Sequence, residues 1–278
     1  MTRIPRIVRY TILTLGGLIF LFPFYFMIIT SVSPPGSTGS LVPPSLDFST
    51  WTFIFAELPI SWNLLNSVVY TLGVVAITLA IGSITGYALA RLSFRGRDTL
   101  FAVILFTLAL PFQLLMVPLF IMVSDWGWAR PGPETYLALI FPMAVNATAI
   151  IIFRQFFRGL PQELFDAAYL DGAGNLRILW KIAIPLTRPA FLIATLITFI
   201  GPWNDFLWGL LVVRDTYWQP LSVAVGILGS GAHATAGGGN YWGTVTAAST
   251  LLAVPVIVLF VAFQRYFVRG VIEDGIKG

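Results

Sequence analysis

The sequence contains 278 residues, of which 57% are hydrophobic and 10% are charged, and its mean hydropathy is +0.86. Because soluble domains carry about 25% charged residues, this composition excludes an ordinary soluble protein. The chain has no cysteine, which excludes disulfides and thiolate metal sites. Its net charge of +4 does not indicate nucleic-acid binding, because the basic residues follow the membrane orientation described below.

Six apolar segments, each long enough to cross a bilayer as a helix, follow one another along the chain. The first is predicted to be an uncleaved span, because a signal peptide has an apolar region of only about 7–15 residues. The sequence therefore predicts an all-α, polytopic membrane protein in which residues 1–278 form one transmembrane domain. The predicted spans are residues 10–32, 63–90, 99–123, 135–153, 189–213 and 242–263.

Glycine and proline occur within several of these spans. Gly82 and Gly86 lie four residues apart in the second span, a spacing that lets two helix backbones approach closely in lipid. Glycine is also common in membrane helices, and both interpretations stay open. Pro142, Pro202 and Pro255 lie in later spans, where they are expected either to kink helices for bending motions or to mark irregular packing.

Besides the fourth connection, which is described below, two connections between spans are long. Residues 33–62 are rich in Pro, Ser and Thr and contain no Lys or Arg. Residues 214–241 are predicted to form a loop, whose part from 229 to 239 is nearly all Gly, Ala, Ser and Thr. Such a composition is typical of a flexible segment.

Lysine and arginine are unevenly distributed between the two sides of the predicted membrane. All but Arg130 and Arg214 of the 16 basic residues lie in the N-terminal segment, the second and fourth connections, or the C-terminal tail. Since basic residues mark the cytoplasmic side, both termini are predicted to be cytoplasmic. The fourth connection, which contains residues 161–185, is predicted to lie on the same side.

Residues 161–185 form the only long polar interruption among the apolar segments. The segment begins with Pro161, and Gly172 follows about ten residues later, an arrangement typical of the start and end of a short helix. A second amphipathic stretch follows from about Asn175 to Pro185. We interpret the segment as a surface loop that a partner outside the membrane binds; an interfacial amphipathic helix without a partner is the alternative.

Within this segment, Asp166-Ala167-Ala168 is followed after three residues by Gly172 and, after nine more, by the sequence 182–185, Ile-Ala-Ile-Pro. This spacing resembles the cytoplasmic coupling loop of binding-protein-dependent ABC importer permeases, which usually reads Glu-Ala-Ala, three residues, Gly, nine residues, Ile-x-Leu-Pro. Asp replaces the usual Glu and Ile the usual Leu, and both replacements keep the charge or the apolar character. With the six-span layout, the resemblance covers essentially the whole chain and indicates the carbohydrate-uptake class of maltose-type permeases.

The resemblance implies the type I importer permease fold and ATP-driven alternating access in the inner membrane of a prokaryote. It implies as partners a second homologous permease, two ATPase subunits that would bind ATP and Mg²⁺, and an extracytoplasmic substrate-binding protein. The residues implied to couple this chain to the ATPase are Glu163, Asp166, Ala167, Ala168, Asp171, Gly172 and Pro185.

Two further stretches extend the resemblance. The glycine-rich loop is similar to an outer loop that projects into the binding protein of sugar importers, with a plain linker as the alternative. The C-terminal tail is similar to a terminus that reaches between the ATPase subunits. The residues concerned are Gly229, Ser230 and Gly231 in the loop and Gly275, Ile276, Lys277 and Gly278 in the tail.

Asp205 is the one charged residue deep in apolar sequence, and an ionisable group at membrane depth is a candidate functional residue. Its neighbours Trp203 and Asn204 suit a sugar path, because pyranose rings stack on aromatic faces and hydroxyl groups need hydrogen-bonding partners. Helix packing is the equally weighted alternative. In the maltose-type importers that the chain resembles, the partner permease supplies most substrate contacts.

The sequence lacks the reactive groups of an enzyme. His233 is the single histidine, and neither lysine ends a Gly-x-x-x-x-Gly-Lys-Ser/Thr phosphate loop. We therefore expect no catalytic residue, no metal and no bound cofactor in this chain, so that ATP hydrolysis takes place on another polypeptide. An ion-coupled secondary transporter or channel is the alternative function, but it would require more intramembrane acids than Asp205. The predicted substrate is a sugar or sugar derivative, and a di- or oligosaccharide, a polyol and a sugar phosphate all stay open. A neutral sugar is the first choice, because the outer half carries few basic groups to hold a phosphate.

Overall fold

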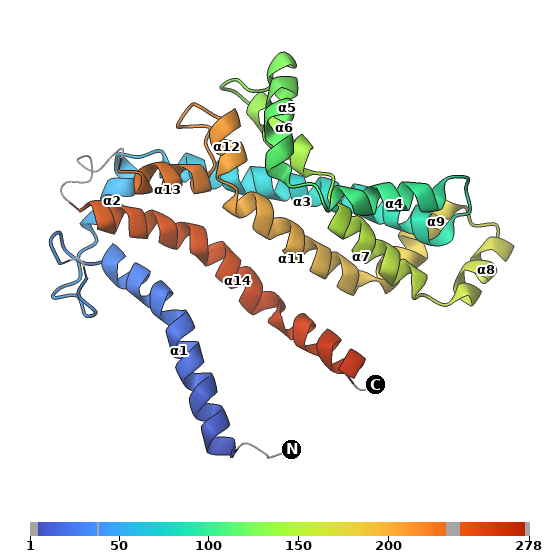
Figure 1. Ribbon diagram of the computed structural model, residues 1–278, viewed down its shortest axis with the longest axis horizontal. Helices are drawn as coiled ribbons and strands as arrows, with labels where there is room; N and C mark the ends of the chain where they lie inside the picture. The colour runs from blue at the N-terminus through green and yellow to red at the C-terminus, as the bar shows by residue number, and fades with distance from the viewer. Residues whose placement is uncertain (1–4, 38, 232–239, 276–278) are drawn as a thin grey trace.

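The computed structural model describes residues 5–37, 39–231 and 240–275, and all regular structure in these ranges is helical. The helices form an elongated bundle with α3 along its length (Figure 1). In chain order they are α1 (Arg6–Ser31), α2 (Ser49–Ala56), α3 (Ile60–Arg91), α4 (Arg97–Thr107), α5 (Phe112–Asp125), α6 (Glu134–Met143), α7 (Ala147–Arg158), α8 (Gln162–Leu170), α9 (Asn175–Ile178), a π-helical turn (Leu179–Ala183), α10 (Ile184–Leu186), α11 (Arg188–Asn204), α12 (Leu207–Val212), α13 (Leu221–Gly229) and α14 (Tyr241–Gly275).

Three helices, α1, α3 and α14, are long and apolar enough to cross a membrane unbroken. Counting bent pairs of helices as single spans raises the number to as many as six, which agrees with the predicted all-α membrane fold. The bent pairs are α4 with α5 at 99°, α6 with α7 at 55°, and Asn175–Leu186 with α11 at 81°. The predicted spans at 99–123 and 135–153 thus each contain one of these bends. The third bend lies at Thr187, before the predicted span at 189–213, which is interrupted instead between α11 and α12.

Proline and capping residues account for the breaks inside these three predicted spans. α5 begins after Pro111, which has no amide hydrogen to continue a preceding helix. α7 begins after Asn146, whose side-chain oxygen accepts a hydrogen bond from the N–H of Ala149 at 3.1 Å. In the fifth predicted span, Asp205 takes an extended conformation between α11 and α12. Apolar sequence continues through each break, so hydropathy alone does not reveal it.

Both long connections that were predicted as loops contain a helix. α2 lies within residues 33–62, and α13 lies within residues 214–241, where it begins after Pro220. Ile54 of α2 and Leu221 of α13 are both fully buried in one apolar cluster, which explains why these short segments are helical. α14 also continues beyond its predicted end at residue 263, as far as Gly275.

α3 is the central helix and packs along α7 and α11 (Figure 1). A methyl group added at Gly86 would lie 2.6 Å from Cβ of Phe153 and 2.9 Å from the backbone nitrogen of Arg154, both in α7. At Gly82 the nearest atom would be in the ring of Phe153, at 3.3 Å. Close backbone approach, one of the two interpretations of this glycine pair, is therefore confirmed at Gly86.

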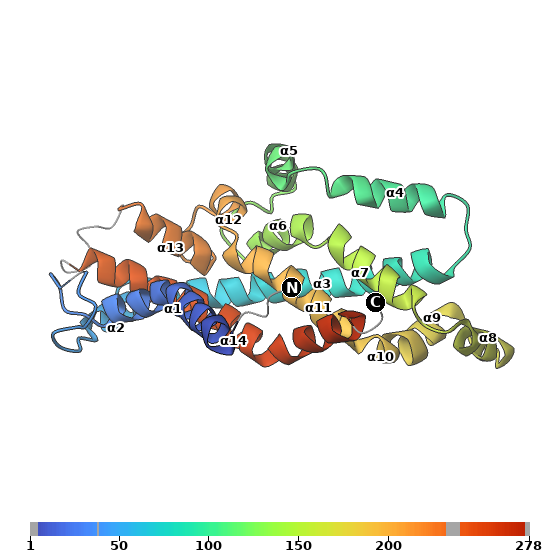
Figure 2. The same cartoon turned by 60° about the horizontal axis from the view of Figure 1, so that its bottom comes forward.

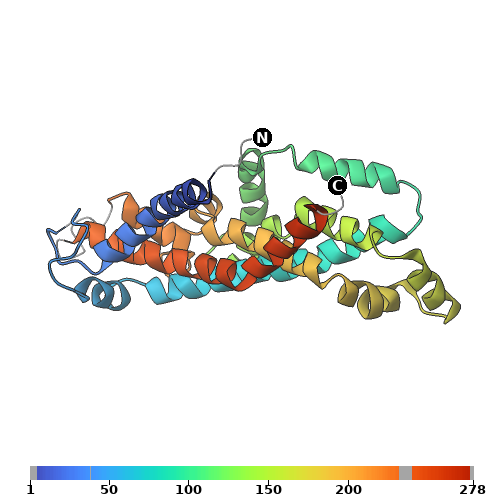
Figure 3. The same ribbon diagram turned by 90° about the horizontal axis from the view of Figure 1, so that it is seen from below.

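The N-terminal end of α3 holds the connection between α12 and α13. The side-chain amide of Asn63 donates hydrogen bonds to the carbonyls of Thr216 at 2.7 Å and Gln219 at 2.8 Å. Asn66 donates in the same way to the carbonyl of Tyr217 at 2.8 Å. Buried side-chain bonds thus fix this connection to α3, at the opposite end of the bundle from α8 (Figure 3).

α4 and α5 lie on the outside of the bundle (Figure 2). Within the described part of the chain, α4 has no buried residue and α5 buries only Val123. One contact that joins α4 to α7 places the guanidinium of Arg154 over the ring of Phe101, 3.8 Å from its centroid. Most of the apolar surface of α4 and α5 is therefore left for lipid or for another subunit.

Candidate functional site

α8 is a short helix whose ends are set by Pro161 and Gly172. Pro161 directly precedes the first helical residue, and Gly172 has a φ of +74°, which residues with a side chain rarely adopt. The N–H of Gly172 donates to the carbonyl of Tyr169 at 3.0 Å, and the N–H of Ala173 donates to the carbonyl of Ala168 at 2.9 Å. These two bonds form a Schellman motif, which ends α8 and turns the chain toward α9.

One face of α8 is buried within this chain and the other is exposed. Phe165 and Ala168 are the buried residues. Ala168, which the resemblance includes among the coupling residues, lies on the buried face, where its methyl group packs in an apolar cluster of this chain. The exposed residues combine negative charge with apolar surface, and among them Leu170 is 89% exposed. They include Glu163, Leu164, Asp166, Ala167, Leu170 and Asp171.

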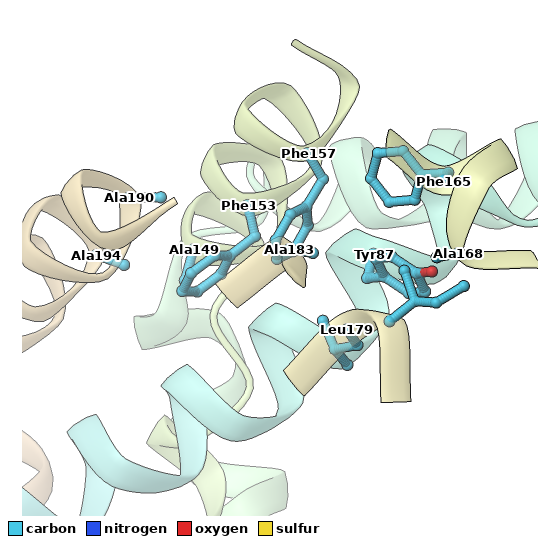
Figure 4. Packing of buried hydrophobic residues seen from close by; sticks show 11 residues of the cluster. Tyr87, Ala149, Phe153, Phe157, Phe165, Ala168, Leu179, Ala183, Ala190 and Ala194 are labelled. Atoms are coloured by element: carbon cyan, nitrogen blue, oxygen red, sulfur yellow. The ribbon is translucent and has the colours of Figure 1, made fainter. Parts of the chain in front are cut away.

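An aromatic cluster supports the buried face of α8 (Figure 4). The ring of Phe165 lies 6.5 Å from that of Tyr87 in α3, and Tyr87 meets Phe157 of α7 edge to face at 5.7 Å. Phe157 stacks on Phe153 at 6.0 Å. α8 therefore rests on the ends of α3 and α7 through apolar contacts.

Arg91, the last residue of α3, makes polar contacts in the same region. Its Nε donates to the carbonyl of Phe157 at 2.9 Å, its Nη1 to Oε1 of Gln162 at 2.8 Å, and its Nη2 to the carbonyl of Leu160. The guanidinium carbon lies 4.1 Å from the centroid of the Phe165 ring. In the sequence Arg91 is one of the basic residues that indicate membrane orientation. Its hydrogen-bond partners lie 66 to 71 residues further along the chain, beyond the reach of any local pattern.

Pro185 and Gly172 lie on different parts of the segment. Gly172 is exposed directly after α8, whereas Pro185 is exposed within α10, beyond the π-helical turn. Pro185 lines a surface groove between α10 and α11 with Ile184, Arg188, Pro189, Phe191 and Leu192.

Asp205 caps the short helix α12. Its Oδ1 accepts a hydrogen bond from the N–H of Trp208 at 3.2 Å, and its Oδ2 accepts from the N–H of Gly209 at 3.2 Å and from the hydroxyl of Tyr70 at 3.3 Å. The hydroxyl of Ser222 donates to its backbone carbonyl at 2.5 Å. Both carboxylate oxygens thus have partners within the chain, which supports the helix-packing interpretation of this residue.

Trp203 and Asn204 differ in their surroundings. Trp203 is only 1% exposed, stacks on Phe199 at 5.3 Å and donates from Nε1 to the carbonyl of Leu252 at 2.8 Å. In this conformation its ring is not accessible to a solute. Asn204 is exposed, and its amide donates to the carbonyl of Ile200 in its own helix at 3.0 Å.

The loop predicted to reach a binding protein begins at the end of α13. Gly229 is the last residue of that helix, Ser230 is exposed, and Gly231 has a φ of +80°. The hydroxyl of Tyr241 donates to the carbonyl of Gly229 at 2.8 Å, which ties this end of the loop to the start of α14. Residues 232–239, which include the single histidine, lie outside the described residues.

The tail predicted to contact ATPase subunits is described only as far as Gly275, the last residue of α14. Ile276, Lys277 and Gly278 lie outside the described residues. Over the part of the chain that the structure describes, no group of three or more His, Cys, Asp or Glu side chains is placed to hold a metal ion.

The helical fold and the motif in residues 161–185 are typical of one class of membrane transport protein. Residues 78–273 match the family described as binding-protein-dependent transport system inner membrane component, and the chain belongs to this family. It is a multi-pass permease of an ABC importer, a transport component rather than an enzyme, and it works in an importer that includes a binding protein. The resemblance noted in the sequence is therefore confirmed, and the alternative of an ion-coupled transporter or channel is not supported.

Particular relatives lie within the same family. The chain is 35% identical over 280 residues to the arabinooligosaccharides transport system permease protein AraQ of Halalkalibacterium halodurans, covering 96% of each chain. It is 32% identical over 275 residues to the lactose transport system permease protein LacG of Rhizobium radiobacter, covering 97% of this chain and 96% of that one. A crystal structure of a bacterial ABC transporter involved in the import of the acidic polysaccharide alginate matches with a TM-score of 0.82 and 26% identity, covering 96% of this chain and all of that chain.

Proposed function

We propose that this permease imports a neutral sugar or oligosaccharide by alternating access, driven by ATP hydrolysis on separate subunits. The observation that carries the proposal is the form of α8, a helix exposed on one side and anchored on α3 and α7 on the other. Its exposed face offers an apolar side chain, Leu170, beside the carboxylates of Glu163 and Asp166. Such a combination suits docking to another protein.

The residues proposed to take part in coupling are Glu163, Asp166, Ala167, Ala168, Asp171, Gly172 and Pro185, of which Ala168 acts from the buried face of α8. In this proposal α8 lies on the cytoplasmic side, together with both chain termini, and the ATPase subunits that bind it carry the ATP and Mg²⁺. The tail from Gly275 to Gly278 reaches toward the same subunits. Closure of the ATPase dimer moves α8 and with it the ends of α3 and α7, which opens the spans outward.

The other proposed partners bind the opposite end of the bundle and its sides. Gly229, Ser230 and Gly231 are proposed to face an extracytoplasmic binding protein. A second, homologous permease is proposed to pack against this chain, and the exposed apolar surface of α4 and α5 supports such a contact. The solute path between the two permeases is proposed to include Asn204, whose side chain is exposed.

The substrate class rests on the named relatives and on charge. Of the similar proteins described above, the two permeases are named for arabinooligosaccharides and lactose, both neutral sugars, whereas the solved transporter is described for an acidic polysaccharide. Binding of a phosphate or carboxylate favours arginine side chains. Of the two arginines assigned to the outer side, Arg130 is already paired with Glu134 at 3.6 Å. A neutral solute fits this side better than a sugar phosphate.

The test is copurification of the tagged permease from its native membrane, followed by a ligand screen on the associated binding protein with arabinotriose, lactose and a hexose phosphate. We expect a second permease and an ATPase to copurify, and we expect the binding protein to retain a neutral sugar. Uptake of that sugar into proteoliposomes should require ATP and the ATPase. Solute movement by the isolated chain, or retention of the sugar phosphate alone, would contradict the proposal.

A further inference from the structure

We propose that Arg91 is a positioning residue that fixes α8 to the ends of α3 and α7, so that the three helix ends move as one body. This inference rests on the proposed role of α8 as the element that docks to the ATPase. Arg91 lies at the end of the second span, outside the motif in residues 161–185. The inference therefore adds a residue from another part of the chain to the coupling mechanism.

The hydrogen bonds of Arg91 connect three separate pieces of the chain. The Phe157 carbonyl belongs to the last turn of α7, the Leu160 carbonyl to the link between α7 and α8, and the Gln162 side chain to the first residue of α8. The last carbonyls of a helix have no partner within that helix. Arg91 therefore supplies a C-terminal cap for α7 from a different helix and holds the start of α8 with the same guanidinium.

The shape of the guanidinium matters for this role. Its N–H groups form a rigid planar fork, so one side chain can serve three acceptors in fixed directions. The plane also lies against Phe165 at 4.1 Å, where the positive charge meets an aromatic face. Because Phe165 is only 1% exposed, this contact joins the polar cap to the apolar support of α8.

Gln162 extends the effect of Arg91 to the acidic residue of the coupling motif. Its Oε1 accepts from Arg91, and its Nε2 donates to Oδ1 of Asp166 at 3.0 Å. Asp166 is thus oriented by Arg91 through one intervening side chain. Loss of Arg91 would loosen α8 and also release the carboxylate of Asp166.

The experiment measures whether α8 keeps a fixed distance from the end of α3. The chain has no cysteine, so Ser93→Cys in the exposed loop after α3 and Leu170→Cys on α8 carry a unique pair of spin labels. Pulsed EPR is recorded on the full complex with its ATPase subunits, without nucleotide and after trapping with ATP and vanadate. We expect one distance that is the same in both states, because α8 moves together with α3.

When Arg91→Gln is added to the doubly labelled protein, the single distance should be replaced by a broad distribution of distances that differs between the two nucleotide states. Arg91→Lys should also lose it, because an ammonium group on a flexible stem cannot reproduce the fork; a residue needed only for its positive charge would be rescued by lysine. The matched control is Arg95→Gln, which removes the same charge from an exposed position in the same loop and should keep the single distance.

The outcomes separate this inference from the function on which it rests. The Leu170 label alone should lose mobility when the ATPase subunits bind, and a label that stays mobile contradicts the docking role of α8. An immobilised label together with an unchanged single distance in Arg91→Gln contradicts only the positioning role of Arg91. Should Arg91→Gln fail to accumulate in the membrane, Gln162→Ala removes an exposed acceptor instead, and a single distance retained in that variant overturns the inference.

Discussion

Asp205 shows how a charged group can occupy apolar sequence for a structural reason. Its carboxylate accepts the N–H groups of Trp208 and Gly209 as the capping residue of a helix does. The hydroxyl of Tyr70 adds a third bond from α3. The carboxylate therefore stabilises the start of α12 directly after the break and connects it to α3, the central helix.

We expect Asp205→Ala to lower the free energy of unfolding by about 0.5–2 kcal/mol, as loss of a helix cap does, and Asp205→Asn to cost less because one acceptor oxygen remains. The measurement is the thermal unfolding midpoint of the purified permease complex in detergent, compared with sugar uptake. The control for the unfolding midpoint is Asn204→Ala, whose exposed side chain bonds to Ile200 within its own helix; it is no control for uptake, because Asn204 lies on the proposed solute path. A loss of uptake in Asp205→Ala with an unchanged midpoint would indicate solute contact instead of packing.

Gly172 and Gly174 form a matched pair for testing the turn after α8. Added methyl groups would meet no atom within 4 Å at either position, but Gly172 has a φ of +74° and Gly174 has a φ of −74°. A side chain in the left-handed conformation costs roughly 1–2 kcal/mol. We expect Gly172→Val to remain in the membrane but to lower sugar uptake per ATP hydrolysed by about 5- to 30-fold.

The same substitution at Gly174 should leave that ratio unchanged, because an extended backbone accepts valine. Membrane abundance, ATP hydrolysis and uptake are measured for both variants in proteoliposomes. Equal ratios in Gly172→Val and Gly174→Val would remove the turn after α8 from the coupling mechanism.

Among the helices, the contact of α3 with α7 depends on a glycine. Because an added methyl group at Gly86 would meet backbone atoms of α7, the helices would have to separate. We expect Gly86→Ala to destabilise the protein by about 1–3 kcal/mol, as overpacking does. Gly201→Ala is the control, since its added methyl group would meet no atom within 4 Å. Thermal unfolding in detergent measures both, and a midpoint for Gly86→Ala at or above that of the parent chain would contradict close packing.

The elements differ in how far the sequence predicts them. α8 is predicted well, from Pro161 to Gly172, because its start and end depend on local backbone chemistry. The breaks beside Pro111, Asn146 and Asp205 are not predicted. Hydropathy is averaged over about 20 residues, and one capping side chain changes that average little. α2 and α13 are missed for a different reason: they are short helices that become stable by burying apolar residues against α14 and α3.

In the candidate site too, some residues can be recognised from the sequence and others only from the fold. The motif residues of α8 are recognised from their spacing, whereas Arg91 belongs to the site only because the fold brings the end of α3 beside the end of α7. The sequence also does not reveal that Ala168 and Trp203 are buried within this chain. A single sequence gives no means to distinguish an inward from an outward face on a helix as short as α8.

For the whole molecule, the proposed orientation places α8 and the end of α13 on opposite sides of the membrane. Single cysteines at Ser93 and Ser230, both exposed, can test this in a chain that has no other cysteine. In intact cells, a membrane-impermeant maleimide should label Ser230→Cys but should label Ser93→Cys only after the membrane is permeabilised. The unsubstituted chain is the blank, and labelling of Ser93→Cys from outside would reverse the proposed orientation.

The hydrogen bonds at the two ends of α3 have a mechanical consequence. With 32 residues, this helix is about 48 Å long, and a continuous helix bends only gently. Asn63 and Asn66 hold the α12–α13 connection at one tip, while Arg91 holds α8 at the other. If α3 tilts about its middle, its two ends move in opposite directions. A displacement of α8 at one membrane face therefore moves the α12–α13 connection at the other face directly, through one continuous helix.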